Sequence, residues 1–197
     1  MTRGYSLGQD LKLLVNNPKY SDIEIFCGDE KKLYGVRAIL AARSEVFDRL
    51  FYNGMKESHE NQISFPSINS SEMEIILEYT YTGSVSEGSL TKDNVVETFY
   101  TADYFQLPDL QDLIMKTIIE INYKENCSPE LLSKVVNTMP LTEDDIFLNL
   151  LVETVAITSL NTIEFGRLSI EALQYAHTKR KNILKPQNMK FFDIVLF

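Results

Sequence analysis

"YGVRAILAARSEVFDRLFYNGMKES", residues 34–58, is the stretch that decides the fold. Its first apolar run, at residues 37–43, predicts a short helix. Ser44 is a suitable N-cap for the next helix, and Asn53-Gly54 is a suitable end for it. The apolar residues of that second helix recur at helical spacing: Val46, Phe47, Leu50 and Phe51. Nothing in the stretch is typical of catalysis, and its apolar spacing predicts two helices that pack.

Alternating apolar residues around this stretch predict a small β-sheet. The alternation occurs in three segments: residues 21–28 (SDIEIFCG), 32–36 (KLYGV) and 61–65 (NQISF). In the first segment Ile23, Ile25 and Cys27 share one face of a strand, and turn residues join it to the second segment as a hairpin. In the third segment Ile63 and Phe65 share one face.

The rest of the chain predicts helices. An N-terminal helix follows Ser6, with Leu7, Leu11, Leu14 and Val15 on one stripe before Pro18 closes it. Ser71 opens a helix that Gly83 ends, and Pro108 fits the first position of another. Further helices begin at Ser128 and at Thr142, where Thr142 and Asp145 resemble a capping box. The apolar stripe expected there is Ile146, Phe147, Leu150 and Leu151.

These elements predict an α+β fold in which a three-stranded sheet is embedded in a cluster of helices. The polar segment at residues 123–129 marks the expected domain boundary. Residues 1–122 form the first domain, residues 123–185 an all-helical region, and residues 186–197 a tail of uncertain structure.

Composition excludes several classes of function. The net charge of −9 argues against binding to nucleic acid through its phosphates. Two cysteines are too few for a disulfide framework and favour a reducing compartment. The N-terminus lacks a signal-peptide core, and Asn149 and Glu153 interrupt the longest apolar run, so no membrane association is expected. We expect a soluble protein of the cytoplasm, with the nucleus as an alternative suggested by the basic residues 178–185.

No group of residues predicts an enzyme. His59 and His177 lie far apart and have no cysteine or histidine at ligand spacing, so no metal is expected. Cys27 on a strand face is typical of a packed core residue. The acidic residues 143–145 stand where a helix dipole favours negative charge. Neither a catalytic residue nor a cofactor is expected.

Taken in order, these segments resemble a BTB/POZ domain over roughly residues 5–122. The resemblance rests on four segments: SDIEIF, VRAILAARSEVFDRLF, ISFPSINSSEMEIILEYTYTG and TADYFQLPDLQDL. Members of the family usually carry a histidine where this chain has Val36, whereas Arg37, Leu40, Ser44 and Phe47 fit. Residues from 123 resemble the start of a BACK domain, the helical region that often follows BTB in cullin adaptors. Both a fragment and a natural short form are compatible with this ending.

The resemblance implies a protein-interaction module without enzymatic activity. One expectation is a homodimeric substrate adaptor for a cullin–RING E3 ubiquitin ligase, whose partners are a second copy, a cullin scaffold protein and an unknown substrate protein. The alternative is a BTB dimerisation scaffold or transcriptional regulator that does not bind a cullin. The sequence contains no DNA-binding module, which counts against a regulator.

In the family, the N-terminal helix and the helix at residues 37–43 form a two-fold interface. The resemblance also implies that Asp22 and Arg37 approach each other in a pocket at that interface, although two exposed charges are the simpler interpretation. The expected dimer residues are Leu11, Leu14, Asp22, Arg37, Ile39 and Leu40.

A hydrophobic-x-Glu pattern after the third helix is typical of BTB proteins that bind a cullin. Met55-Lys56-Glu57 has this pattern. The flexible thioether of Met55 suits an irregular apolar groove on a partner, and Glu57 suits donors at its edge. Tyr104 and Phe105 are expected to complete the same surface.

Overall fold

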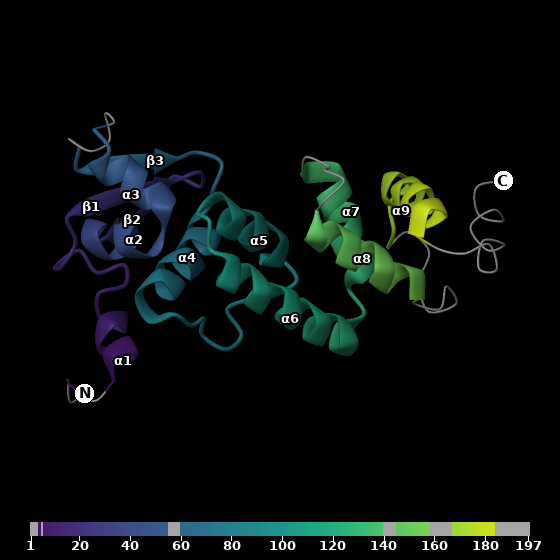
Figure 1. Ribbon diagram of the computed structural model, residues 1–197, viewed down its shortest axis with the longest axis horizontal. Coiled ribbons are helices and arrows are strands. Elements are labelled where there is room, and N and C mark those ends of the chain that lie inside the picture. Colours follow the sequence, from purple (N-terminus) through teal and green to yellow (C-terminus); the bar gives the residue numbers. More distant parts are fainter. Residues whose placement is uncertain (1–3, 5, 55–59, 140–144, 158–166, 184–197) are drawn as a thin grey trace. The chain divides into compact units, whose positions relative to one another are not determined.

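The computed structural model describes residues 4, 6–54, 60–139, 145–157 and 167–183 (Figure 1). The chain divides into two units, Met1–Ile118 and Ile119–Phe197. The first unit combines a small three-stranded sheet with helices, which confirms the predicted fold class. Among the described residues of the second unit only helices occur.

The sheet has the strand order β2-β1-β3. Its strands are β1 (Ile23–Cys27), β2 (Lys32–Gly35) and β3 (Gln62–Phe65). β1 pairs antiparallel with β2, where Ile25 lies opposite Leu33, and parallel with β3, where Ile25 lies opposite Ile63. All three side chains are buried, so the predicted alternation is confirmed.

Among the described residues of the first unit six helices begin, in the predicted order. They are α1 (Leu7–Lys12), α2 (Arg37–Arg43), α3 (Glu45–Tyr52), α4 (Ser70–Thr82), α5 (Val95–Tyr104) and α6 (Pro108–Glu125). Most of α4 is buried, and it contacts α1, α2, α5 and β2 (Figure 1). Gly35 allows α2 to approach the sheet, because a Cβ at this position would lie 2.8 Å from a methyl carbon of Leu40.

Ser44 joins the start of α3 to the end of α5. Its hydroxyl accepts a hydrogen bond from the Phe47 N–H, which confirms the predicted N-cap, and donates to the Phe105 carbonyl at 2.7 Å. The rings around it form one cluster: Phe47 stacks on Phe105 with centroids 4.3 Å apart, and Phe65 meets Phe105 edge-on at 5.3 Å. The cluster joins α3, β3 and α5.

Two helix ends in the first unit differ from the prediction. α1 ends at Lys12, so Leu14 lies in turns that follow it. Those turns are fixed at Asn16, which has a positive φ of 47° and whose side-chain oxygen accepts from the Tyr34 N–H of β2. α4 begins at Ser70 rather than Ser71, because a side chain from a distant part of the sequence accepts hydrogen bonds from the first residue of the helix.

That acceptor is Asp29 in the turn between β1 and β2. Its carboxylate accepts hydrogen bonds from the backbone N–H of Ser70 at 3.0 Å and from the Ser70 hydroxyl at 2.7 Å. Asn69, the residue directly before the helix, makes no side-chain cap hydrogen bond. The hairpin turn therefore caps α4 across about forty residues of sequence.

Within its described residues, the second unit holds the end of α6 and three further helices that contact one another. They are α7 (Ser128–Thr138), α8 (Ile146–Ile157) and α9 (Ile170–Ile183). α7 begins beside Pro129 as predicted. Arg167 connects the unit's segments, since its guanidinium contacts the Glu130 carboxylate and donates to the Asn126 carbonyl.

Three details of the helical region differ from the prediction. α6 continues through Glu125, so part of the expected boundary at residues 123–129 is helical. Asp145 itself accepts from the Leu148 N–H and is the N-cap of α8, whereas Thr142 lies outside the described residues. Ile146 is 56% exposed because it precedes the first buried turn. The buried face of α8 consists of Phe147, Leu148, Leu151, Val152 and Val155.

We expect Asp29→Ala to lower the urea midpoint of unfolding, because two donors at the start of α4 lose their acceptor. Hydrogen bonding from Ser70 holds the pKa of the Asp29 carboxyl below its ordinary value of 3.8. A lowered pKa stabilises the fold above the ordinary value, and that contribution is lost as the pH falls through the folded-state pKa. The difference between the two proteins should therefore be largest near neutral pH and shrink below 3.8.

Glu87→Ala is the matched control, because Glu87 is an exposed acid in the loop after α4. An equal loss of stability in both variants, or a difference that does not depend on pH, would contradict the capping role of Asp29.

Candidate functional site

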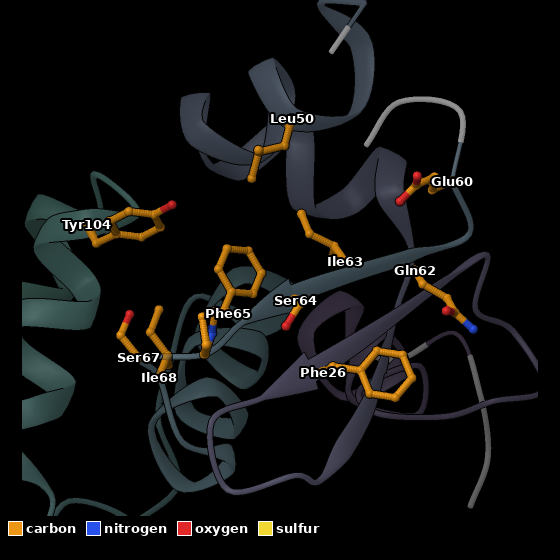
Figure 2. Close-up of a pocket in the computed structure, with 11 residues that line it drawn as sticks. Phe26, Leu50, Glu60, Gln62, Ile63, Ser64, Phe65, Ser67, Ile68 and Tyr104 are labelled. Atoms are coloured by element: carbon orange, nitrogen blue, oxygen red, sulfur yellow. The ribbon is translucent and has the colours of Figure 1, made fainter. Parts of the chain in front are cut away.

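A groove lies along β3, between α3 and the end of α5. We name it the β3 groove; it has a volume of about 510 Å³, and its lining includes Leu50, Glu60, Ile63, Phe65 and Tyr104. Figure 2 shows Leu50 from α3 directed toward Ile63 and Phe65 of the strand, with Tyr104 on one side and Glu60 on the other. Apolar side chains such as Leu50 thus stand beside polar ones such as Glu60 and Gln62, a mixed surface suited to a protein segment.

The buried ring of Phe105 places Tyr104 at this groove. Phe105 is fully buried against Phe47, whereas Tyr104 is 51% exposed and meets Phe65 edge-on at 6.2 Å. Of the two aromatic residues expected at the partner surface, Tyr104 is at the surface. The side chain of Phe105 lies in the core of its own domain instead.

Met55, Lys56 and Glu57 lie outside the described residues, so their expected role stays a prediction. The chain leaves α3 before them and enters β3 after them. Leu50 and Glu60 stand on the two sides of this segment in the sequence, and both line the β3 groove.

A second groove, the α1–α2 groove, has a volume of about 430 Å³. Leu7 and Leu11 of α1 line it together with Ala38, Ile39 and Ala42 of α2. Leu7 is 76% exposed, so its apolar side chain lies open at the edge of this groove.

The structure separates the residues expected at the dimer interface into three places. Leu11 and Ile39 line the α1–α2 groove together. Leu14 is half-buried in the turns after α1. Leu40 is 0% exposed and packs into the core beside Gly35, so in this chain it faces away from solvent.

Asp22 and Arg37 meet through the main chain. The exposed Asp22 carboxylate accepts from the backbone N–H of Arg37, the first residue of α2, at 2.8 Å. The Arg37 guanidinium lies 5.5 Å from the centre of the Phe51 ring and also donates to the Glu60 carbonyl. Asp22 therefore acts as a helix cap in the single chain.

Burial raises the pKa of the Cys27 thiol to about 11, so it is protonated at neutral pH and is a poor nucleophile. Across the described parts of the chain, no three His, Cys, Asp or Glu side chains are grouped as metal ligands would be. In those same parts, no helix is both long and apolar enough to cross a bilayer.

A mixed polar and apolar groove and a mainly apolar groove on a small α+β domain are typical of a protein-interaction module. The chain belongs to the BTB/POZ domain family, whose match covers residues 11–122. It is 33% identical over 119 residues to Kelch repeat and BTB domain-containing protein 8 of Danio rerio, which covers 60% of this chain and 19% of that protein. It is 27% identical over 172 residues to Kelch-like protein 6 of Homo sapiens, covering 87% of this chain and 27% of that protein.

The chain thus spans about a fifth to a quarter of the length of these relatives. Among solved structures, the BTB domain of zebrafish PATZ1 is similar with a TM-score of 0.46 and 19% identity, over 60% of this chain and 99% of that one.

Several groove residues were not predicted from the sequence. Ala38 and Ala42 are four residues apart in α2, so they share a helix face, and small apolar residues at this spacing were the available signal. Leu50 was assigned to the core, because periodicity identifies an apolar face without showing whether another element covers it.

We expect Phe105→Ala to cost about 3–5 kcal/mol of unfolding free energy, because it empties a fully buried site. Tyr104→Ala should cost about 1 kcal/mol or less, because the ring is half exposed. Urea unfolding of both variants measures the difference. Equal costs would contradict the assignment of Phe105 to the core and Tyr104 to the surface.

Proposed function

We propose that this chain is a homodimeric BTB substrate adaptor for a cullin–RING E3 ubiquitin ligase. The observation that carries the proposal is the β3 groove, whose lining residues Leu50 and Glu60 stand on either side of the hydrophobic-x-Glu segment 55–57 in the sequence. The similarity to kelch-repeat and kelch-like BTB proteins supports the same reading.

In this proposal a cullin segment occupies the β3 groove. The half-buried Leu50 offers apolar surface, and the exposed Tyr104 offers both a ring and a hydroxyl. Aromatic side chains of this kind often dominate interface energetics, because the ring is buried while the hydroxyl finds a partner. Met55 adds an adaptable apolar anchor, and Glu57 a charged acceptor at the edge.

A second copy of the chain occupies the α1–α2 groove. Leu7, Leu11 and Ile39 supply an apolar surface that its own domain leaves open. A two-fold contact places the same patch of both copies together, so one apolar groove is sufficient for a self-complementary interface.

The helical unit fits a BACK-like region in this proposal. The similarity to Kelch-like protein 6 extends over 172 residues and therefore beyond the family match that ends at residue 122. We assign to residues 123–185 the role of connecting the BTB domain to a substrate-binding part; the identity of the substrate is left open.

Sedimentation at micromolar concentration should give twice the chain mass of 22.6 kDa. Ala38→Asp should convert the dimer to monomer, because it places a charge inside the α1–α2 groove. Ala38 is exposed in the first turn of α2, where a negative charge suits the helix dipole, so the monomer should keep its circular dichroism spectrum. A clean monomer for the unchanged protein would contradict the proposed dimer.

The double variant Met55→Ala, Glu57→Ala should weaken binding to a cullin N-terminal domain at least about tenfold, which is about 1.4 kcal/mol. The dimer and its melting temperature should not change. Isothermal titration calorimetry measures the affinity, with Asp112→Ala on the exposed side of α6 as the control.

Equal affinity in the double variant and the control would remove residues 55–57 from the proposed site. If the unchanged protein binds no cullin, the scaffold or regulator alternative replaces the adaptor.

A further inference from the structure

Helix α1 forms one wall of the α1–α2 groove and is weakly anchored by apolar contacts. It has six residues, no buried side chain and no side-chain cap at Ser6. A helix of this length is not stable alone in water. Its residue Leu7 is 76% exposed and lines the groove instead of the domain core. Apolar burial within its own chain therefore does little to fix α1.

A polar cluster on the other side of the helix connects α1 to α4. Lys12 Nζ, in the last turn of α1, lies 2.7 Å from Glu78 Oε1 of α4 and donates to Ser86 Oγ at 2.7 Å. Ser86, in the loop after α4, donates to Glu78 through both its N–H at 3.1 Å and its hydroxyl at 2.5 Å. We call these three residues the Lys12–Glu78–Ser86 cluster.

Glu78 is the centre of this cluster. Its side chain is 15% exposed, and burial alone would raise its pKa. The hydrogen bonds from Lys12 and Ser86 outweigh burial and hold the pKa of Glu78 below its ordinary value. A mostly buried carboxylate with several donors contributes more than an exposed ion pair does.

The backbone of α1 also lies close to α4. A Cβ at Gly8 would come within 3.5 Å of the Thr82 carbonyl, at the last residue of α4. Glu78 is one helical turn before Thr82, so the cluster and this close approach act on the same end of α4. Together they fix the position of α1 on α4.

We propose that the Lys12–Glu78–Ser86 cluster positions α1 so that Leu7 and Leu11 complete the dimer interface. This inference rests on the proposed dimer. Glu78 is then a positioning residue for dimerisation, although it does not line the α1–α2 groove. Loss of its charge releases α1, and the interface loses one of its walls.

The test compares Glu78→Gln with Glu24→Gln. Glu24 forms a comparable ion pair with Lys32 at 3.0 Å, but on the sheet and outside the α1–α2 groove. Analytical ultracentrifugation over a dilution series gives the dimer dissociation constant of each variant. We expect Glu78→Gln to raise this constant about tenfold or more, and Glu24→Gln to leave it within about twofold.

A thermodynamic cycle with Leu7→Ala distinguishes positioning from a general loss of stability. In the unchanged background Leu7→Ala should weaken the dimer, whereas in the Glu78→Gln background it should add little, because α1 no longer presents Leu7. In Glu78→Gln, amide hydrogen exchange should become faster in residues 8–12, whereas exchange in the β-sheet should stay the same.

The outcomes separate the two proposals. A monomeric unchanged protein overturns the dimer and this inference with it. If the unchanged protein is a dimer, either of two results overturns the positioning role alone. One is an unaltered dimer dissociation constant in Glu78→Gln, and the other is an equal effect of Leu7→Ala in both backgrounds. If Glu78→Gln does not fold, Lys12→Gln takes its place in the same cycle, because Lys12 is 55% exposed and its removal leaves the core intact.

Discussion

The hydroxyl of Ser44 is the contact on which the β3 groove depends. The hydroxyl accepts a hydrogen bond from the Phe47 N–H in the first turn of α3 and donates one to the Phe105 carbonyl at the end of α5. Both hydrogen bonds lie inside a cluster of aromatic rings. The three walls of the groove come from α3, β3 and α5, and Phe47, Phe65 and Phe105 each belong to one of these segments. A buried hydrogen bond of this kind is costly to leave unmade, so the relative placement of the walls is fixed from inside.

The two helices that contribute to the two grooves are neighbours in the sequence, because only Ser44 separates α2 from α3. α2 contributes Ala38, Ile39 and Ala42 to one groove, and α3 contributes Leu50 to the other. Leu40, on another face of α2, packs against the sheet. One short helical pair therefore divides its faces between the core and two separate grooves, which the proposed adaptor uses for a second copy and for a cullin.

Local sequence patterns predicted most of the elements. Alternation identified β1 and β3, Ser44 and Gly83 identified helix ends, and the order of segments identified the family. Long-range contacts were not predicted: Asp29 caps α4 from a distant turn, and Asn16 fixes the end of α1 through Tyr34. The grooves were missed in part for the same reason, because a pattern shows that Leu50 is apolar and does not show which neighbour leaves it uncovered.

Both cysteines of the chain are buried, Cys27 at 6% and Cys127 at 3% exposure, and one lies in each unit. An oxidant or an alkylating reagent reaches either sulfur only when the surrounding structure opens. The rate of thiol modification is therefore a measure of how often each unit opens, and the two sites report on the two units independently. The protein carries its own pair of chemical probes for local unfolding, with no engineered label needed.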